Sequence, residues 1–160
     1  MKKSLIGFVI LAVMSVVCFA EVDSKLMEQR KAEVKAFVDE AQAYIKKVGK
    51  DEALKEFQKA DGKFVRGELY LFVNTMKGIT LVQPMKPNLV GKDLSTMKDP
   101  NGKMFFADFA KAAASKEGKG WVEYVWQHPK TKDFQPKISY IVAIDKDTYM
   151  GAGVYVNKID

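Results

Sequence analysis

The spacing of apolar residues changes along this chain, and the change restricts the folds it can adopt. From Lys25 to Val48 apolar side chains recur at helical spacing, with Met27, Val34 and Ala41 on one stripe. Beyond Leu69 the chain instead carries short runs rich in aliphatic and aromatic residues, several of which alternate apolar with polar side chains. A long amphipathic helix followed by half-buried strands predicts an α+β fold.

The expected elements can be bounded from caps and turns. Ser24 is expected to cap the helix 25–48 and Gly49 to end it, with a short helix over 51–57 and another over 104–114. Strands are predicted over the segments 69–73, 79–82, 121–126, 138–144 and 149–156. Hairpin connections make the predicted five-stranded sheet antiparallel. A coiled-coil seam on 25–48 is an alternative, although the stripe has only the minimum length for one.

The first twenty residues have the layout of a secretory signal peptide. A basic start at Lys2 and Lys3 precedes an apolar run from Leu5 to Phe19, and Ala20 stands before a polar stretch. We therefore expect residues 1–20 to be removed and residues 21–160 to form one domain, periplasmic or secreted. An uncleaved anchor helix and lipidation at Cys18 are the alternatives. The apolar run is shorter than the ~20 residues that span a bilayer.

Charge gives little support to nucleic-acid binding. The full chain has 26 basic and 20 acidic residues, a net charge of +6, and the two lysines of the leader contribute +2 of it. The charges are interspersed rather than clustered in a basic stripe. No nucleic-acid partner is expected, and the small excess of positive charge mildly favours anionic ligands.

The residue inventory argues against an enzyme or a metalloprotein. His128 is the only histidine, and it is expected to be an exposed turn residue. Cys18 is the only cysteine and lies in the predicted leader, so the mature chain would have no thiolate. No nucleophile elbow or phosphate-binding glycine loop is present. We expect no catalysis, no cofactor and no metal.

Five short motifs, in order, resemble the single Cache domain family. They are GELYLFV (67–73), VQPMKPNLVGKDLSTMKDPNGK (82–103), GWVEYVWQHP (120–129), QPKISYIVAID (135–145) and MGAGVYVNKID (150–160). The resemblance covers roughly Lys25 to Asp160. It implies a PAS-like extracytoplasmic sensor domain that binds small organic ligands, with a pocket between the sheet and the segment 83–98 together with the helix that follows it.

Alternation along 121–126 places Tyr124 and Trp126 on one face, where they are either pocket walls or ordinary core aromatics. The resemblance favours the pocket. Lys137 follows Pro136 and is the only basic residue in its apolar motif, so its ammonium either pairs with a ligand carboxylate or extends to solvent at the strand end. The full set of expected ligand-binding residues is Lys137, Tyr124, Trp126, Tyr140, Gln83, Tyr70, Phe72 and Met85.

Two details of this predicted site are unusual. Lys137 and Tyr140 are three residues apart, so strict alternation puts them on opposite faces. Either a bulge at Pro136 re-aims Lys137, or only one of the two lines the pocket. Gln83-Pro84 stands where many relatives have His-Pro, and glutamine cannot take a positive charge.

The resulting prediction is a stand-alone sensory domain that binds a short monocarboxylate and acts through a membrane receptor or kinase partner, as a monomer or weak dimer. The alternative is a structural or interaction module that works through the 24–48 helix without a small-molecule ligand.

Overall fold

The computed structural model describes residues 6–156, with side chains from residue 24 onward. Helix α1 runs from Ile6 to Val48 and is followed by α2, Lys50–Phe57. The predicted stop is confirmed, because α1 ends at Val48 and Gly49 has φ 86°, a conformation that suits glycine. The predicted cap is wrong, since Ser24 lies inside α1. Removal of residues 1–20 stays a prediction.

The predicted five-stranded antiparallel sheet is confirmed. Its order is β4-β3-β7-β6-β5, built from β3 Phe72–Thr75, β4 Thr80–Val82, β5 Lys119–Gln127, β6 Phe134–Ala143 and β7 Thr148–Tyr155. Helix α3, Phe105–Ala113, is confirmed within one residue of its expected bounds. The short 3₁₀ helix η1, Pro87–Leu89, lies in the segment between β4 and α3.

One predicted strand divides into two. The segment 69–73 breaks at Leu71 into β2, Leu69–Tyr70, and β3, and β2 pairs with β1, Val65–Arg66, in a separate two-stranded sheet. Glu68 lies in the turn of this small hairpin, next to Gly67 with φ 64°. The hairpin was not predicted, and it brings Glu68 and Tyr70 toward the end of β7.

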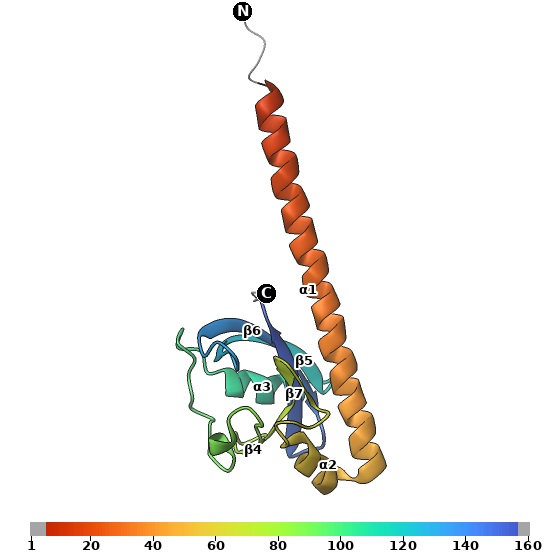
Figure 1. Ribbon diagram of the computed structural model, residues 1–160. Helices are drawn as coiled ribbons and strands as arrows, with labels where there is room; N and C mark the ends of the chain where they lie inside the picture. Colours follow the sequence, from red (N-terminus) through yellow and green to blue (C-terminus); the bar gives the residue numbers. More distant parts are fainter. Residues whose placement is uncertain (1–5, 157–160) are drawn as a thin grey trace, which may run out of the picture.

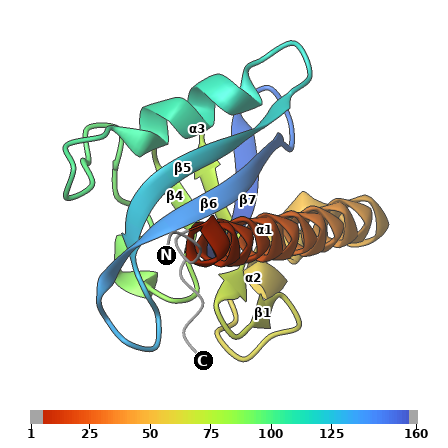
Figure 2. The same cartoon turned by 90° about the horizontal axis from the view of Figure 1, so that it is seen from above.

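The sheet separates two apolar cores, one under each helix (Figures 1 and 2). On one face, Val34, Phe37, Val38 and Ala41 of α1 pack against Ile138, Tyr140 and the neighbouring strands. On the other face, Phe105, Phe106 and Phe109 of α3 pack against Tyr124, Trp126 and Tyr155. The apolar stripe of α1 is therefore covered by its own sheet.

Two glycines of β7 allow close packing on the α3 side. A Cβ at Gly151 would lie 2.5 Å from Cζ of Phe72, and one at Gly153 would lie 2.1 Å from Oγ of Ser139. Both contacts are too short for real atoms, so the missing side chains leave the space that Phe72 and Ser139 occupy.

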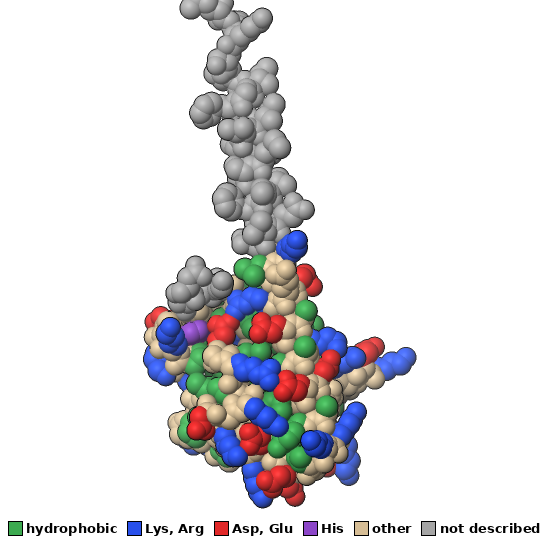
Figure 3. Space-filling view, turned by 45° about the vertical axis from the view of Figure 1, so that its right-hand side comes forward, with side chains coloured by type: hydrophobic (Ala, Val, Ile, Leu, Met, Phe, Trp, Pro, Cys, Tyr) green, Lys and Arg blue, Asp and Glu red, His purple; other side chains and the backbone are tan. Residues whose placement is uncertain are grey.

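The surface carries mixed charge. Figure 3 shows basic and acidic side chains interspersed over the visible face, without a continuous patch of either sign. Among the residues with described side chains, 24–156, no helix is long and apolar enough to cross a membrane.

Candidate functional site: an aromatic cavity beside a buried lysine

A small cavity lies between the sheet and α3. Its walls are Tyr70, Phe72, Gln83, Phe105, Phe106, Phe109, Tyr124 and Trp126. The ring of Phe105 stacks on that of Tyr124 at 4.7 Å, and Phe72 stacks on Phe109 at 5.3 Å. The cavity is nearly closed. The centre of a water molecule can occupy only about 10 Å³ of it, which is the space that one water needs. A larger ligand would have to move these rings apart.

Lys137 is buried beside this cavity. It lies opposite Tyr124 of β5 and Tyr155 of β7 in the sheet and is 1% exposed. Its Nζ lies 4.1 Å from the ring centre of Tyr70, a cavity wall, and 4.7 Å from that of Tyr155. Within residues 24–156 this nitrogen has no hydrogen-bond partner.

Burial without a carboxylate lowers the pKa of Lys137 to about 7. The two aromatic faces favour the cation but do not replace an anion. The ammonium therefore adjoins the cavity as a charge that protein groups leave largely uncompensated, and a ligand carboxylate would compensate it.

Polar groups near Lys137 are few and mostly engaged. The hydroxyls of Tyr124 and Ser139 lie 3.1 Å apart, and the hydroxyl of Tyr155 donates to the carbonyl of Gln127 at 2.8 Å. Oε1 of Gln83 is buried and, like Nζ of Lys137, has no partner within the described residues. Burial raises the pKa of Tyr70 to about 12, so this tyrosine is a neutral donor at ordinary pH. The cavity thus offers one cation, neutral polar groups and flat apolar walls.

The structure brings most of the predicted site residues together. Gln83, Tyr70, Phe72, Tyr124 and Trp126 line the cavity, and Lys137 adjoins it. Tyr140 lies on the opposite face, where it packs in the α1 core and against Trp121 at 4.9 Å. Met85 lines a hollow outside the cavity.

Of the two alternatives for Lys137 and Tyr140, the bulge at Pro136 is wrong. The register of β5 with β6 runs without a shift from Lys119–Val142 to Gln127–Phe134, with Val125 opposite Pro136. Strict alternation alone therefore separates Lys137 from Tyr140.

The exposed position expected for His128 is also wrong. His128 is 5% exposed, its ring packs against Tyr155 at 4.6 Å, and burial together with the nearby charge of Lys137 lowers its pKa. Its Nδ1 accepts from the backbone N–H groups of Lys130 and Thr131, so Nε2 carries the proton and donates to Glu68 at 3.4 Å.

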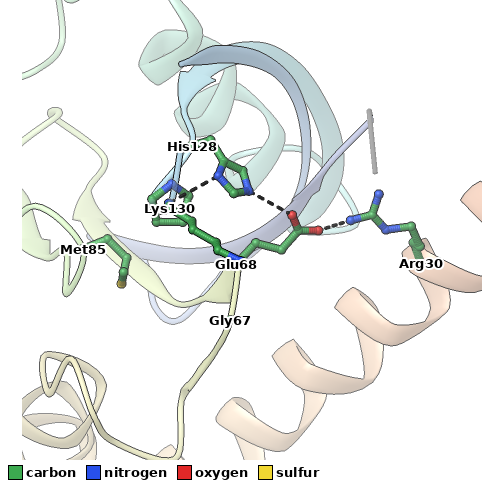
Figure 4. Close-up of a pocket in the computed structure, with 7 residues that line it drawn as sticks. Arg30, Gly67, Glu68, Met85, His128 and Lys130 are labelled. Carbon is green, nitrogen blue, oxygen red and sulfur yellow. Dashed lines mark hydrogen bonds and ion pairs between the residues drawn. The ribbon is translucent and has the colours of Figure 1, made fainter. Parts of the chain in front are cut away.

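Glu68 also pairs with Arg30 of α1, and Arg30 donates to the backbone carbonyl of Tyr155. Figure 4 shows Arg30, Glu68 and His128 in line beside a pocket that Met85 and Lys130 also border. This row of contacts joins the end of β7 to α1. It contains no group of His, Cys, Asp or Glu side chains that could hold a metal, and neither does the rest of the described chain.

The helix after the segment 83–98 was expected to cover the pocket, and α3 does so. Its wall residues Phe105, Phe106 and Phe109 were not named among the expected ligand-binding residues. Their spacing places three large rings on one face of a nine-residue helix, which is the signal that could have identified them.

A PAS-like sheet with an enclosed aromatic cavity and a buried cation is the architecture of a small-molecule sensor domain. The chain belongs to the Cache domain family, whose sequence profile matches residues 60–160. Cache domains are extracytoplasmic sensory modules, found in chemoreceptors and in histidine kinases.

Solved structures agree with this family. A methyl-accepting chemotaxis protein from Vibrio parahaemolyticus superposes with a TM-score of 0.76 at 26% identity, covering 88% of this chain and 98% of that one. A Cache chemosensory domain described for its recognition of carboxylic acid superposes with a TM-score of 0.61 at 25% identity, covering 88% of this chain and 97% of that one.

Two curated proteins are similar in sequence. The sensor histidine kinase MctS of Rhizobium johnstonii is 32% identical over 91 residues, and the methyl-accepting chemotaxis protein McpP of Pseudomonas putida is 31% identical over 91 residues. Each match covers 56% of this chain but only 19% and 16% of the two proteins, so the chain spans under a fifth of their length.

Proposed function

We propose that this protein is an extracytoplasmic sensory domain that binds a short monocarboxylate in the aromatic cavity without changing it chemically. The observation that carries the proposal is the ammonium of Lys137, buried against two aromatic rings with no hydrogen-bond partner in the described chain. A carboxylate would supply the missing counter-charge, and the rings would receive a short alkyl end. The recognition of carboxylic acid by a similar Cache domain supports this ligand class.

Each remaining site residue has a role in this proposal. Tyr124, Trp126, Tyr70 and Phe72 form the walls, and Gln83 provides a neutral hydrogen-bonding group. Tyr140 and Met85 are left out because they lie outside the cavity.

Calorimetry on Lys137→Met tests the proposal. Acetate, propionate, lactate and pyruvate are titrated into the wild type and the variant. Loss of the ion pair should weaken binding by roughly 2–5 kcal/mol, which removes measurable binding of a weak ligand. Lys119→Met, at an exposed lysine of β5, is the matched control and should bind as the wild type does. Unchanged affinity in a folded Lys137→Met protein would contradict the proposal.

The alternative function, pairing of the 24–48 helix with another helix, has less support. The apolar residues that such a seam would need, Val34, Phe37 and Ala41, are buried against the sheet.

We propose further that residues 1–20 are a cleaved leader, that residues 21–160 form the domain, and that a receptor or kinase partner carries the signal onward. Intact mass from a secreting host tests the leader. The expectation of a stand-alone protein stays a prediction.

A further inference from the structure

A second hollow adjoins the cavity from outside. It has a volume of about 580 Å³ and lies between the segment 85–99 and the ends of β5 and β6. Phe105 and Trp126 line both this hollow and the inner cavity. The two spaces are therefore separated by the side chains of these two residues. We call the outer space the vestibule.

The charge in the vestibule is positive and largely uncompensated. Lys86, Lys98 and Lys132 line it, and none of the three has a carboxylate within ion-pairing distance among residues 24–156. The pKa of Lys86 is lowered by burial and then by the charge of Lys132, so the two ammonium groups repel each other.

Asp99 compensates only one of these three positive charges. It is the only acidic residue of the lining, and both of its oxygens are already engaged. Oδ1 accepts from the N–H groups of Asn101 and Lys103 at 2.9 Å, and Oδ2 accepts from that of Val125 at 3.0 Å. The carboxylate thus fixes the loop to β5.

The vestibule also has an apolar side. Phe134 is 60% exposed, and Leu89 and Met97 are half-buried beside it. A lining that combines ammonium groups lacking a carboxylate partner with exposed apolar side chains suits an anion that carries a short apolar group.

Lys86 stands at the boundary of the two spaces. Its Nζ lies 5.0 Å from the ring centre of Trp126 and donates to Oε1 of Gln127 at 2.6 Å. An anion that drew Lys86 away from Gln127 would also release the ring of Trp126, one of the two side chains between vestibule and cavity.

We propose that the vestibule is an outer anion site through which small organic carboxylates reach the inner cavity, with Lys86 and Lys132 attracting the anion and Lys86 holding Trp126 closed. This inference rests on the proposed function, because it assigns a route to the same ligand class.

Collisional quenching of Trp126 tests the inference without any carboxylate. Trp121→Phe leaves Trp126 as the only tryptophan, since the chain has two. At low ionic strength, iodide, caesium and neutral acrylamide are compared in this background, with and without Lys86→Met plus Lys132→Met. Lys111→Met plus Lys116→Met removes the same charge outside the vestibule and is the control.

Relative to acrylamide, which reports access to the ring alone, the vestibule pair should lower the iodide quenching constant by about fivefold, the effect of a nearby charge in water, and raise that of caesium. Acrylamide quenching should rise in Lys86→Met alone, because the ring is freed, and stay unchanged in Lys132→Met. An equal ratio of iodide to acrylamide quenching in all proteins, or an equal fall of this ratio in the control pair, would overturn the inference. Carboxylate binding at Lys137 is measured separately by calorimetry. Failure of the proposed function can therefore be told apart from failure of the proposed vestibule site.

Discussion

Lys137 combines a charge, full burial and a pKa of about 7, and each property affects how it can bind a carboxylate. The titratable groups around it do not add charge above neutral pH. Burial raises the pKa of Tyr70 and Tyr155, and the pKa of His128 is lowered, so all three are neutral there. The protonation of Lys137 alone should then govern binding.

Affinity for a monocarboxylate should fall as pH rises above about 7. The carboxylate pairs with the ammonium form, and the protonated fraction of free Lys137 falls about tenfold for each pH unit above its pKa. We therefore expect Kd to rise about tenfold for each pH unit between pH 7.5 and 9. Binding at pH 8 should also take up close to one proton, which calorimetry in buffers of different ionisation enthalpy measures. A Kd independent of pH would show that Lys137 is not the ion-pairing group.

The same residue should reduce stability in the absence of ligand. In the unfolded chain Lys137 has an ordinary pKa near 10.5, whereas in the fold its pKa is about 7. Between these values the unfolded state binds more protons, so the free energy of unfolding rises as pH rises through this window. The slope is at most about 1.4 kcal/mol per pH unit.

Lys137→Met should remove this contribution and stabilise the protein at neutral pH. Denaturant unfolding between pH 7 and 9.5 measures both effects, with Lys119→Met as control. Identical pH profiles for the wild type and Lys137→Met would contradict a lowered pKa at this site.

At the scale of elements, strand β6 serves both cores. Its alternation directs Lys137 and Ser139 toward the α3 side and Ile138 and Tyr140 toward α1. Because alternation is a property of the sequence, the sequence alone predicts that Lys137 and Tyr140 lie on opposite faces. It did not decide which face contains the cavity. That depends on where α3 packs, which involves residues far away in the chain.

Helix α1 should contribute to stability through its buried face. Phe37 is 2% exposed and contacts the ring of Phe64 at 5.9 Å. Phe37→Ala should cost about 3–5 kcal/mol of unfolding free energy, because the substitution leaves a cavity between the helix and the sheet. Lys35→Ala, on the exposed side of the same helix, should leave the free energy of unfolding nearly unchanged. Equal effects in chemical denaturation would mean that α1 is not packed as described.

Sequence patterns predicted the elements better than the loops. Helical spacing identified residues 25–48 of α1 and helix α3, and apolar runs located the five strands of the large sheet, because each pattern reflects burial of one local face. The break at Leu71 was missed, since the run 69–73 reads as one continuous apolar strand. The burial of His128 was missed because it arises from Tyr155, Glu68 and Arg30, which meet only in the fold.

At the scale of the whole molecule, a single buried cation lies beside a single aromatic cavity in the described chain. The cavity walls are aromatic, and Lys137 is the cation beside them. A ligand with one carboxylate and a short alkyl end satisfies this arrangement, whereas a dicarboxylate would bring a second charge into an apolar space.

Two- and three-carbon monocarboxylates should therefore bind more tightly than succinate. Titration of acetate, propionate, lactate, pyruvate and succinate into one preparation compares them directly. The burial of an unpaired second carboxylate should weaken succinate by at least tenfold relative to the best monocarboxylate. Tighter binding of succinate than of every monocarboxylate would show a larger or more cationic cavity than the one described.

Tyr155 is held from both sides of the sheet. Its ring lies against Lys137, while its backbone carbonyl accepts from Arg30 of α1. If an occupant of the cavity draws Lys137 toward it, the ring of Tyr155 loses that contact, and the main chain of the same residue is hydrogen-bonded to α1. The nuclear magnetic resonance signal of the Arg30 guanidinium should therefore change when the cavity is filled. Because Arg30 lies on the α1 side of the sheet, this signal reports on the ligand without a dye or label beside it.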